Sequence, residues 1–286
     1  MTLPSATLLA QSALSGLFVG ALYGLIGLGL GLSWGLLRTI NLAHFAFTFA
    51  AAYLCYQLVT VTGIDPLLTL IVIVPLFFAL GVALQALLQR FAVSALNSLL
   101  VTFGVTAIIE AAIQAIWSAD FRRLESHYAQ AKFKWGALYL PVPELITLGF
   151  AIALSLALWA LLKHTDLGKA LRAAEHDAPI AAAFGVNQRA LALLLAGTCA
   201  ALAAVAGVCL SLSFTLAPSQ IYAWIGVVFA AVMMGGLGSA LGPLVAGVII
   251  GVSEALTMAI TAPSWAPIVS FTLLIALLLL RPGRVG

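Results

Sequence analysis

Long apolar segments, repeated from one end of the sequence to the other, constrain this chain more than any other feature. Each approaches or exceeds the length of about 20 residues that an α-helix needs to cross the hydrocarbon core of a membrane. Hydrophobic residues make up 64% of the 286 residues and charged residues only 7%, far from the averages of soluble domains. The sequence therefore predicts an all-α, polytopic transmembrane helical bundle.

Breaks between the apolar segments define nine candidate spans. They are, approximately, 8–36, 40–61, 66–89, 94–117, 142–162, 190–214, 221–238, 243–261 and 266–281. Because a segment that enters the membrane and turns back can be miscounted as a span, the expected number is about eight to nine. The segments 40–61 and 221–238 are the main candidates for re-entry. We expect residues 1–286 to form a single transmembrane domain.

Two polar stretches, about 118–141 and 163–189, carry most of the charge between the spans. Cytoplasmic loops of membrane proteins are enriched in Lys and Arg. If 163–189 is cytoplasmic and 118–141 external, alternation places eight basic residues inside and four outside. The inside set is Arg38, Arg90, Lys163, Lys169, Arg172, Arg189, Arg281 and Arg284, and the outside set is Arg122, Arg123, Lys132 and Lys134. This bias predicts an external N-terminus and a cytoplasmic C-terminus.

Glycines recur at intervals of four in the first span and again near the C-terminus. Lipid provides no hydrophobic drive between helices, so close contact depends on small residues that let two backbones approach. The first span carries two such series, and we expect it to pack on two neighbours. The glycines concerned are Gly16, Gly20, Gly24, Gly27, Gly31 and Gly35, with Gly247 and Gly251 in a later span.

Motifs of ATP hydrolysis and of metal chemistry are missing. The pair Gly168-Lys169 is followed by Ala170, so the chain has no phosphate-binding loop of the G-x-x-x-x-G-K-[ST] type. There is no H-E-x-x-H and no Cys/His cluster, and we expect the three cysteines to be free, inert thiols. The chain is therefore expected to be no enzyme, to need no cofactor or metal, and to bind no nucleic acid.

Polar residues inside the apolar segments are the candidates for a substrate path, because a charge at membrane depth costs several kcal/mol and usually faces a cavity or a partner. Glu110 lies between VTAII and AAIQAIW, and Glu254 lies in GVIIGVSEALTMAI. Each carboxyl group can line a path, or it can link two helices by hydrogen bonds. Both readings remain open for both residues.

Asn41 and His44 form a second candidate pair. They follow the glycine-rich stretch GLGLGLSWG and Arg38, where a broken helix could present free N–H groups to an anionic part of a substrate. A role in the path and a purely structural role are both compatible with the sequence. His44 can titrate near neutral pH, although a lone histidine is more often a fixed hydrogen-bond partner.

The stretch 163–189 is predicted to form two short helices. Thr165 or Asp166 can cap the first, and Asp177 with Pro179 can open the second. Gly185 can end the second helix in a left-handed cap. The apolar run at 181–184 would be unusual on a solvated connector, so we expect a docking surface. The candidate docking and coupling residues are Thr165, Gly168, Arg172, Ala182, Gly185 and Asn187.

Three segments resemble the permeases of branched-chain amino-acid importers, and specifically the smaller permease subunit. TDLGKALRA with AFGVN is similar to the family's T-x-L-G-x-A-x-R-A pattern that ends in GV/GI-N. LLRTINLAHFAFTFAAAY is similar to its LR-x-I-N-x-A-H segment, and MMGGLGSALGPLVAGVIIGVSEAL to its GGLGS-x-x-G-x-x-x-G segment. The three occur in the expected order and extend over most of the chain.

The resemblance implies a permease subunit in the bacterial inner membrane, with multiple spans and with ATP hydrolysed by other subunits. The implied partners are a second, related permease, two cytoplasmic ATPases, a periplasmic or lipid-anchored substrate-binding protein, and membrane lipid. It also implies that residues 165–187 contact the ATPases. The substrate would be a branched-chain or related amino acid.

One departure from the family's pattern bears on the substrate. Family members usually carry Gly and then an acidic residue after the histidine, whereas this chain has Phe45 and Ala46 after His44. Relatives in this permease group also import urea and short amides, so these remain alternative substrates. An ion-coupled secondary transporter or channel is the alternative mechanism, with Glu110, Glu254 or His44 as the ion site.

Overall fold

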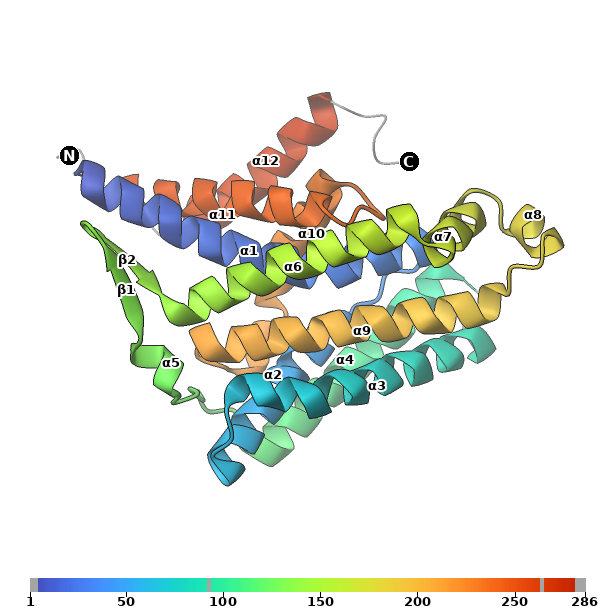
Figure 1. The fold of residues 1–286 in the computed structure, drawn as a ribbon, viewed down its shortest axis with the longest axis horizontal. Coiled ribbons are helices and arrows are strands. Elements are labelled where there is room, and N and C mark those ends of the chain that lie inside the picture. The colour runs from blue at the N-terminus through green and yellow to red at the C-terminus, as the bar shows by residue number, and fades with distance from the viewer. Residues whose placement is uncertain (1–4, 92–93, 263–264, 281–286) are drawn as a thin grey trace.

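The computed structural model describes residues 5–91, 94–262 and 265–280 of the chain. Helices that run lengthwise form an elongated bundle (Figure 1). The first half contains α1 Ala6–Leu37, α2 Ala43–Thr62, η1 Pro66–Thr69, α3 Leu70–Phe91, α4 Ala95–Trp117, α5 His127–Gln130, β1 Lys132–Trp135 and β2 Leu138–Pro141. The second half contains α6 Val142–His164, α7 Asp166–His176, α8 Ala178–Ala183, α9 Gln188–Ser213, η2 Pro218–Ile221, α10 Ala223–Gly235, α11 Gly242–Ile260 and α12 Ala266–Leu280.

Eight helical segments in the described parts are long and apolar enough to cross a membrane, which confirms the polytopic bundle. Each matches one of the first eight spans expected from the sequence. The ninth expected span corresponds to α12, which has 15 residues and is shorter than the roughly 20 that a bilayer requires. The end of that span and the two basic residues Arg281 and Arg284 lie outside the described residues.

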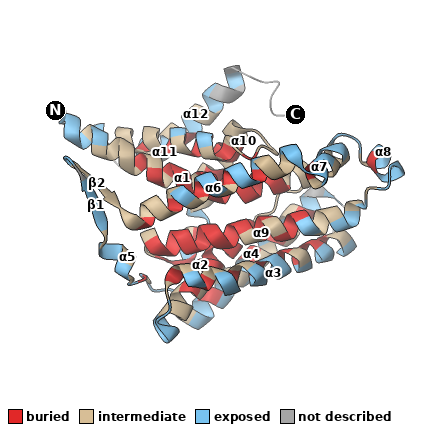
Figure 2. Ribbon diagram, in the orientation of Figure 1, coloured by how far each residue is buried: buried red, intermediate tan, exposed pale blue. Residues whose placement is uncertain are grey.

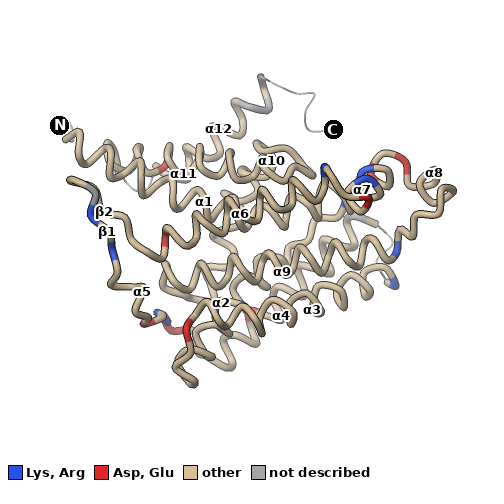
Figure 3. The backbone as a smooth tube through the Cα atoms, in the orientation of Figure 1, with Lys and Arg blue, Asp and Glu red and all other residues tan. Residues whose placement is uncertain are grey.

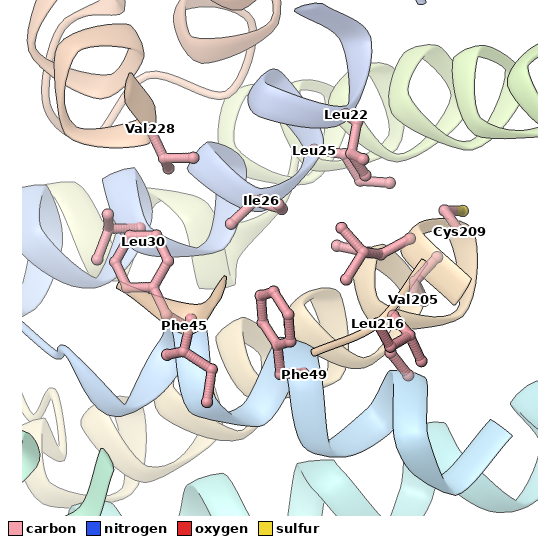
Figure 4. Close-up of a cluster of buried hydrophobic side chains, with 14 of the residues drawn as sticks. Leu22, Leu25, Ile26, Leu30, Phe45, Phe49, Val205, Cys209, Leu216 and Val228 are labelled. Carbon is pink, nitrogen blue, oxygen red and sulfur yellow. The ribbon is translucent and has the colours of Figure 1, made fainter. Parts of the chain in front are cut away.

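The centre of the bundle is formed by α1 and α9, the two segments with the largest buried share (Figure 2). Side chains from α1, α2, α9 and α10 meet there in one apolar cluster. Figure 4 shows Leu25 and Ile26 of α1 above Phe45 and Phe49 of α2, with Val205 of α9 at the side. By contrast, α3 and α4 expose many large apolar side chains, as expected for helices that face lipid.

The glycines of α1 contact two neighbouring helices, as the sequence predicts. A β-carbon on Gly20 would collide with the backbone of Gly247 and with Val248 of α11, and one on Gly16 would collide with Gly251. Further along α1, Gly27 and Gly31 face Val232 of α10 and Pro243 of α11. The two series therefore allow α1 to pack closely on α11, on α10 and on the loop between α10 and α11.

Both segments suspected of re-entry begin inside the bundle. α2 starts at Ala43, and His44 already lies against Gly29, in the second half of α1. α10 has only 13 residues, and the ring of Trp224, in its first turn, packs against Tyr23 of α1. Each of these helices therefore begins part-way along α1, although both segments are among the eight that are long and apolar enough to cross a membrane.

The expected break in the glycine-rich stretch before Asn41 is wrong in position. α1 continues as an unbroken helix through these glycines to Leu37 and ends at Arg38, whose φ is 55°. The interruption follows at 38–42. The glycines serve packing instead of ending the helix, because their missing side chains admit α10, α11 and His44.

The two polar loops lie at opposite ends of the bundle (Figure 3). One end carries α5 and the antiparallel pair β1–β2, and the other carries α7 and α8 (Figure 1). The small strand pair was not predicted from the sequence. Its signal is the symmetrical pattern KFKW-GA-LYLP, in which Gly136 takes a φ of +62° at the turn, a conformation that glycine adopts without strain.

Candidate functional site

Asn41 lies in the short connection between α1 and α2, at the point where α2 begins inside the bundle. The backbone N–H of Leu42 donates to Thr102 Oγ1 of α4 at 3.2 Å. Asn41 Oδ1 is inaccessible to solvent and has no hydrogen-bond partner among the described residues. The N-cap residue of α2, Leu42, has no side chain that can cap the helix, and the N–H groups of His44 and Phe45 donate to the carbonyl oxygens of Asn41 and Leu42. The Asn41 amide oxygen is therefore the unsatisfied group at this helix end.

His44 points away from this helix end and into α1. It is 2% exposed, and its Nε2 lies 2.9 Å from the carbonyl oxygen of Ile26. A β-carbon at Gly29 would touch the imidazole ring, so glycine makes room for it. The geometry is that of a fixed hydrogen-bond partner that fastens the start of α2 to α1.

Glu254 forms a buried link between three helices. Its carboxylate accepts a hydrogen bond from the Tyr23 hydroxyl of α1 at 3.1 Å and another from the Ser270 hydroxyl of α12. The side chain is 7% exposed within the described structure. These contacts match the helix-linking reading of the residue.

Glu110 differs from Glu254 in its surroundings. It lies on α4, where the Gln114 side chain donates to its Oε1 at 3.2 Å, and Tyr222, just before α10, also contacts its carboxylate. The residue is only partly buried. Among the described residues no hydrogen bond or ion pair joins Asn41, His44, Glu110 and Glu254 to one another, so the four do not form one cluster.

The stretch 165–187 forms the two short helices that the sequence predicts. The side chain of Thr165 accepts from the N–H of Gly168 at 3.1 Å, and that of Asp177 accepts from Ile180 at 3.0 Å. Gly185 ends α8 with a φ of +88°, and Asn187 caps α9 through the N–H of Ala190 at 3.1 Å. We call residues 165–187 the α7–α8 hairpin.

One side of the α7–α8 hairpin is anchored to the bundle. Gly168 approaches the backbone of Leu162 so closely that a β-carbon would collide with it. Leu171 is buried with residues of α1, α6 and α9. The guanidinium group of Arg38 donates to the carbonyl oxygen of Glu175 at 2.9 Å and so caps the end of α7.

The other side of the hairpin is exposed and apolar. Phe184 is 85% exposed and Ile180 is 56% exposed, and Ala182 between them is exposed as well. Arg172 is exposed on α7. Lys169 donates to Asp166 at 2.9 Å, and this hydrogen bond lowers the pKa of the Asp166 carboxyl group. The hairpin thus presents small and aromatic apolar side chains beside charges.

The opposite end is held together by polar contacts that sequence reasoning missed. The Tyr128 hydroxyl donates to Asp65 Oδ2 at 2.8 Å and ties α5 to the α2–α3 connection, and this hydrogen bond raises the pKa of Tyr128. The amide of Gln11 in α1 pairs with both backbone groups of Tyr139, at 2.9 and 3.0 Å. Contacts across such sequence distances leave no local signal.

The pentapeptide Gly31–Gly35 matches the G-x-S-x-G pattern of hydrolase nucleophiles. That pattern acts where a strand turns sharply into a helix and exposes the serine. Here the five residues lie inside α1, and Ser33 is 4% exposed. The match therefore has no catalytic context.

A comparison with protein families gives a match over nearly the whole chain. Residues 12–278 match the family described as branched-chain amino acid transport system / permease component. The high-affinity branched-chain amino acid transport system permease protein BraD of Pseudomonas aeruginosa is 25% identical over 290 residues, covering 96% of this chain and 94% of the relative.

Two further relatives carry similar names. The permease protein LivH of the high-affinity branched-chain amino acid transport system of Salmonella typhimurium is 26% identical, over 96% of this chain and 94% of its own length. A probable branched-chain amino acid transport permease protein LivH of Methanocaldococcus jannaschii is 28% identical, over 90% of this chain and 86% of its own length. No solved structure matches significantly.

Proposed function

This chain belongs to the branched-chain amino acid transport permease family, and from that premise we propose that it is the membrane-spanning permease subunit of an ATP-driven importer of branched-chain or related amino acids. It is a multi-pass protein of the bacterial inner membrane with at least eight apolar helices suited to span it. Its residues 1–286 act as one permease domain, and ATP is hydrolysed by separate subunits.

The α7–α8 hairpin is the observation that carries the proposal. Three capping side chains and Gly185 fix its shape, while its outer surface leaves Ile180 and Phe184 bare to solvent. A protein gains nothing from holding such an apolar surface rigidly in water unless a partner covers it. We assign Thr165, Gly168, Arg172, Ala182, Gly185 and Asn187 to the structure or contact surface of an ATPase-coupling element.

The start of α2 is the part of the chain we assign to the substrate path. The N-terminus of α2 lies inside the bundle and carries the partial positive charge of a helix start, which suits the carboxylate of an amino acid. The N–H groups of Leu42, His44 and Phe45 already have acceptors, so this attraction rests on the helix dipole. Asn41 adds an amide with an unsatisfied oxygen, a suitable acceptor for an ammonium group. Glu110 is the second candidate for the path, whereas the contacts of His44 and Glu254 favour structural links.

Besides lipid, the proposed assembly adds three kinds of component to this chain. A second, related permease completes the path, two cytoplasmic ATPases bind the hairpins of the two permeases, and a periplasmic or lipid-anchored binding protein delivers the amino acid. Alternating access then follows from movement of the hairpin, which is fastened to α1, α6 and α9 through Leu171 and Arg38.

The proposal also assigns orientation. The hairpin end would be cytoplasmic and the end with α5 and β1–β2 external, because Lys and Arg favour the inside. A reporter fused after Gly286 should be active only as a cytoplasmic reporter. A reporter fused near His127 should be active only as an exported one, and the reverse pattern would invert the assignment.

Transport by the reconstituted assembly tests the function itself. The permeases, the ATPases and the binding protein are placed in liposomes, and uptake of radiolabelled leucine, glutamate and urea is compared. We expect leucine uptake that requires ATP and the binding protein and that persists when ion gradients are collapsed. Uptake that needs a gradient and no ATP would support an ion-coupled transporter, and preference for urea would change the substrate.

A further inference from the structure

A cavity of about 720 Å³ lies behind the α7–α8 hairpin. Its walls come from the ends of α1 and α3, the second half of α7, the start of α8 and the start of α9. Neither Asn41 nor His44, at the start of α2 to which the path was assigned, is among its lining residues. Apolar wall is supplied by side chains such as Leu37, Leu171 and Leu191.

Charged side chains of both signs line the same cavity, and no ion pair among the described residues involves them. Arg38 and Arg189 contribute guanidinium groups, and Glu175 and Asp177 contribute carboxylates. The ion pairs found in the described structure are His127 with Asp65 and Lys169 with Asp166, both elsewhere.

These four residues differ in how far their side chains are already used. Arg38 donates one hydrogen bond to the carbonyl oxygen of Glu175. A guanidinium group carries five N–H donors, so Arg38 has further donors available for a ligand. Asp177 caps α8. The side chains of Arg189 and Glu175 make no hydrogen bond within the described parts of the chain.

We propose that this cavity binds a zwitterion with an apolar tail, and that the bound molecule restrains the hairpin. The anionic group of the ligand contacts Arg189 and Arg38, its ammonium group contacts Glu175, and its tail packs on the leucines. Two sources offer this chemistry: a free amino acid on this side of the membrane, or a phosphatidylethanolamine molecule.

Restraint follows from the position of the cavity. One wall is the hairpin, and the other is formed by the ends of the helices that anchor it. A ligand that bridges Glu175 of α7 and Arg189 of α9 ties these walls together, and movement of the hairpin must then break that bridge. The regulatory consequence rests on the proposed function, because it takes the hairpin as the coupling element.

Binding is measured on the permease–ATPase assembly without its binding protein, in nanodiscs of phosphatidylglycerol. Radiolabelled L-leucine is the probe, with isocaproate and isoamylamine as competitors that each lack one of the two charges. We expect saturable leucine binding that neither competitor displaces efficiently. A parallel sample with phosphatidylethanolamine is analysed by native mass spectrometry, which detects a retained lipid if that is the ligand.

Single substitutions locate the site. Arg189→Gln and Glu175→Gln remove one charge each with no loss of a side-chain hydrogen bond, and each should weaken binding of the detected ligand about tenfold, as expected for loss of one charge-assisted contact. Lys163→Gln, at the same end but outside the cavity, is the matched control and should bind normally. Asn41→Ala removes an amide of the proposed path and should also leave this binding unchanged.

A substitution that fills the cavity distinguishes ligand binding from restraint of the α7–α8 hairpin. Ala174→Phe places a ring in the cavity from its α7 wall, so it should abolish ligand binding and slow leucine uptake several-fold while ATPase binding is retained. Arg189→Gln should instead relieve inhibition of uptake by leucine loaded inside the liposomes.

The inference is overturned if neither leucine nor phosphatidylethanolamine binds, or if binding is lost in Asn41→Ala and kept in the cavity variants. It is also overturned if a segment of an ATPase occupies the cavity. In each case ATP-dependent leucine uptake would still support the proposed function. If that uptake is absent while the ligand still binds in the cavity, the proposed function is wrong and the binding site stands.

Discussion

Small residues serve opposite purposes in two regions of this molecule. Between α1 and α11, Gly16 and Gly20 meet Gly251 and Gly247 so closely that a single β-carbon would collide with backbone. On the α7–α8 hairpin, Ala182 is exposed, and a β-carbon on Gly185 would meet nothing within 4 Å. In the first region small size permits contact that is present in the chain, whereas in the second it leaves a surface that nothing in the described chain covers.

The difference shows that a small residue must be interpreted by what surrounds it. In lipid, close helix contact supplies dispersion and hydrogen-bond energy that the hydrophobic effect does not provide, so the α1–α11 contact contributes to folding. The hairpin lies at the end of the bundle, where an uncovered apolar surface contributes nothing to folding. Substitutions in the first region should therefore reduce the amount of folded protein. Substitutions in the second region should reduce binding of the partner.

The largest effect is expected for Gly20→Leu. The new side chain would meet the Gly247 carbonyl oxygen and the Val248 Cα, and rigid backbone cannot yield as a flexible side chain can. A cost of about 3 kcal/mol or more is expected from such overpacking. Fluorescence-detected size exclusion in detergent should show little folded protein.

Gly104→Leu is the matched control, because a β-carbon at Gly104 of α4 meets nothing within 4 Å. It should fold to near wild-type amounts in the same assay. Equal amounts of folded protein from the two variants would contradict the close contact between α1 and α11.

Ala182→Asp is expected to abolish function without reducing folded protein. If the exposed surface of α8 docks on an ATPase, the carboxylate must lose its water, and a buried, unpaired charge costs several kcal/mol. Pull-down of the ATPases should fall at least tenfold, and leucine uptake should fall with it. Ala129→Asp, an exposed alanine at the opposite end, should bind the ATPases normally. Normal pull-down and uptake for Ala182→Asp would make the hairpin a connector.

Gly185→Val should have a smaller effect of the same kind. Its φ of +88° strains a β-branched residue by about 1–2 kcal/mol. The strain should shift the end of α8, although the new side chain itself has room, because a β-carbon at Gly185 meets nothing within 4 Å. ATPase binding should weaken several-fold while membrane levels stay normal. Gly149→Val, at an open helical position of α6 with no positive φ, is the control, and a larger loss there would contradict a specific role for the turn.

Most of the fold could be predicted because apolar length, glycine spacing and capping residues are local signals. The caps at Thr165 and Asp177 and the turn at Gly185 follow from residue types within a few positions of one another. The position of the break before α2 could not be predicted in the same way. Glycines that admit another helix and glycines that end a helix look identical until their neighbours are known.

The candidate path residues illustrate the same limit. Glu254 and Glu110 both appear in the sequence as lone carboxylates in apolar runs, yet only Glu254 meets hydroxyl groups from two other helices. His44 finds its partner in a backbone carbonyl 18 residues earlier. Such long-range partners determine whether a polar residue is satisfied internally or left for a substrate, and composition does not encode them.

The smallest effect is expected for Glu254→Gln, which tests whether the contact between α1 and α11 also carries transport chemistry. Glutamine keeps the shape of the side chain, its amide oxygen still accepts from one hydroxyl, and its NH₂ group can donate to the other after that hydroxyl rotates. The link between Tyr23, Glu254 and Ser270 therefore survives, with a stability cost of about 1 kcal/mol. Uptake of leucine should remain within about twofold of wild type.

Glu254→Ala provides the contrast, because it leaves both hydroxyls without their acceptor and opens a void between the helices. It should lower the amount of folded protein more than Glu254→Gln does, at a cost of about 2–3 kcal/mol. A proton-coupled mechanism requires a different ranking, in which the glutamine variant folds and binds the ATPases normally but transports nothing. Measuring uptake per folded complex for both variants separates the two mechanisms, because a structural link loses folded protein first, whereas a proton carrier loses turnover first.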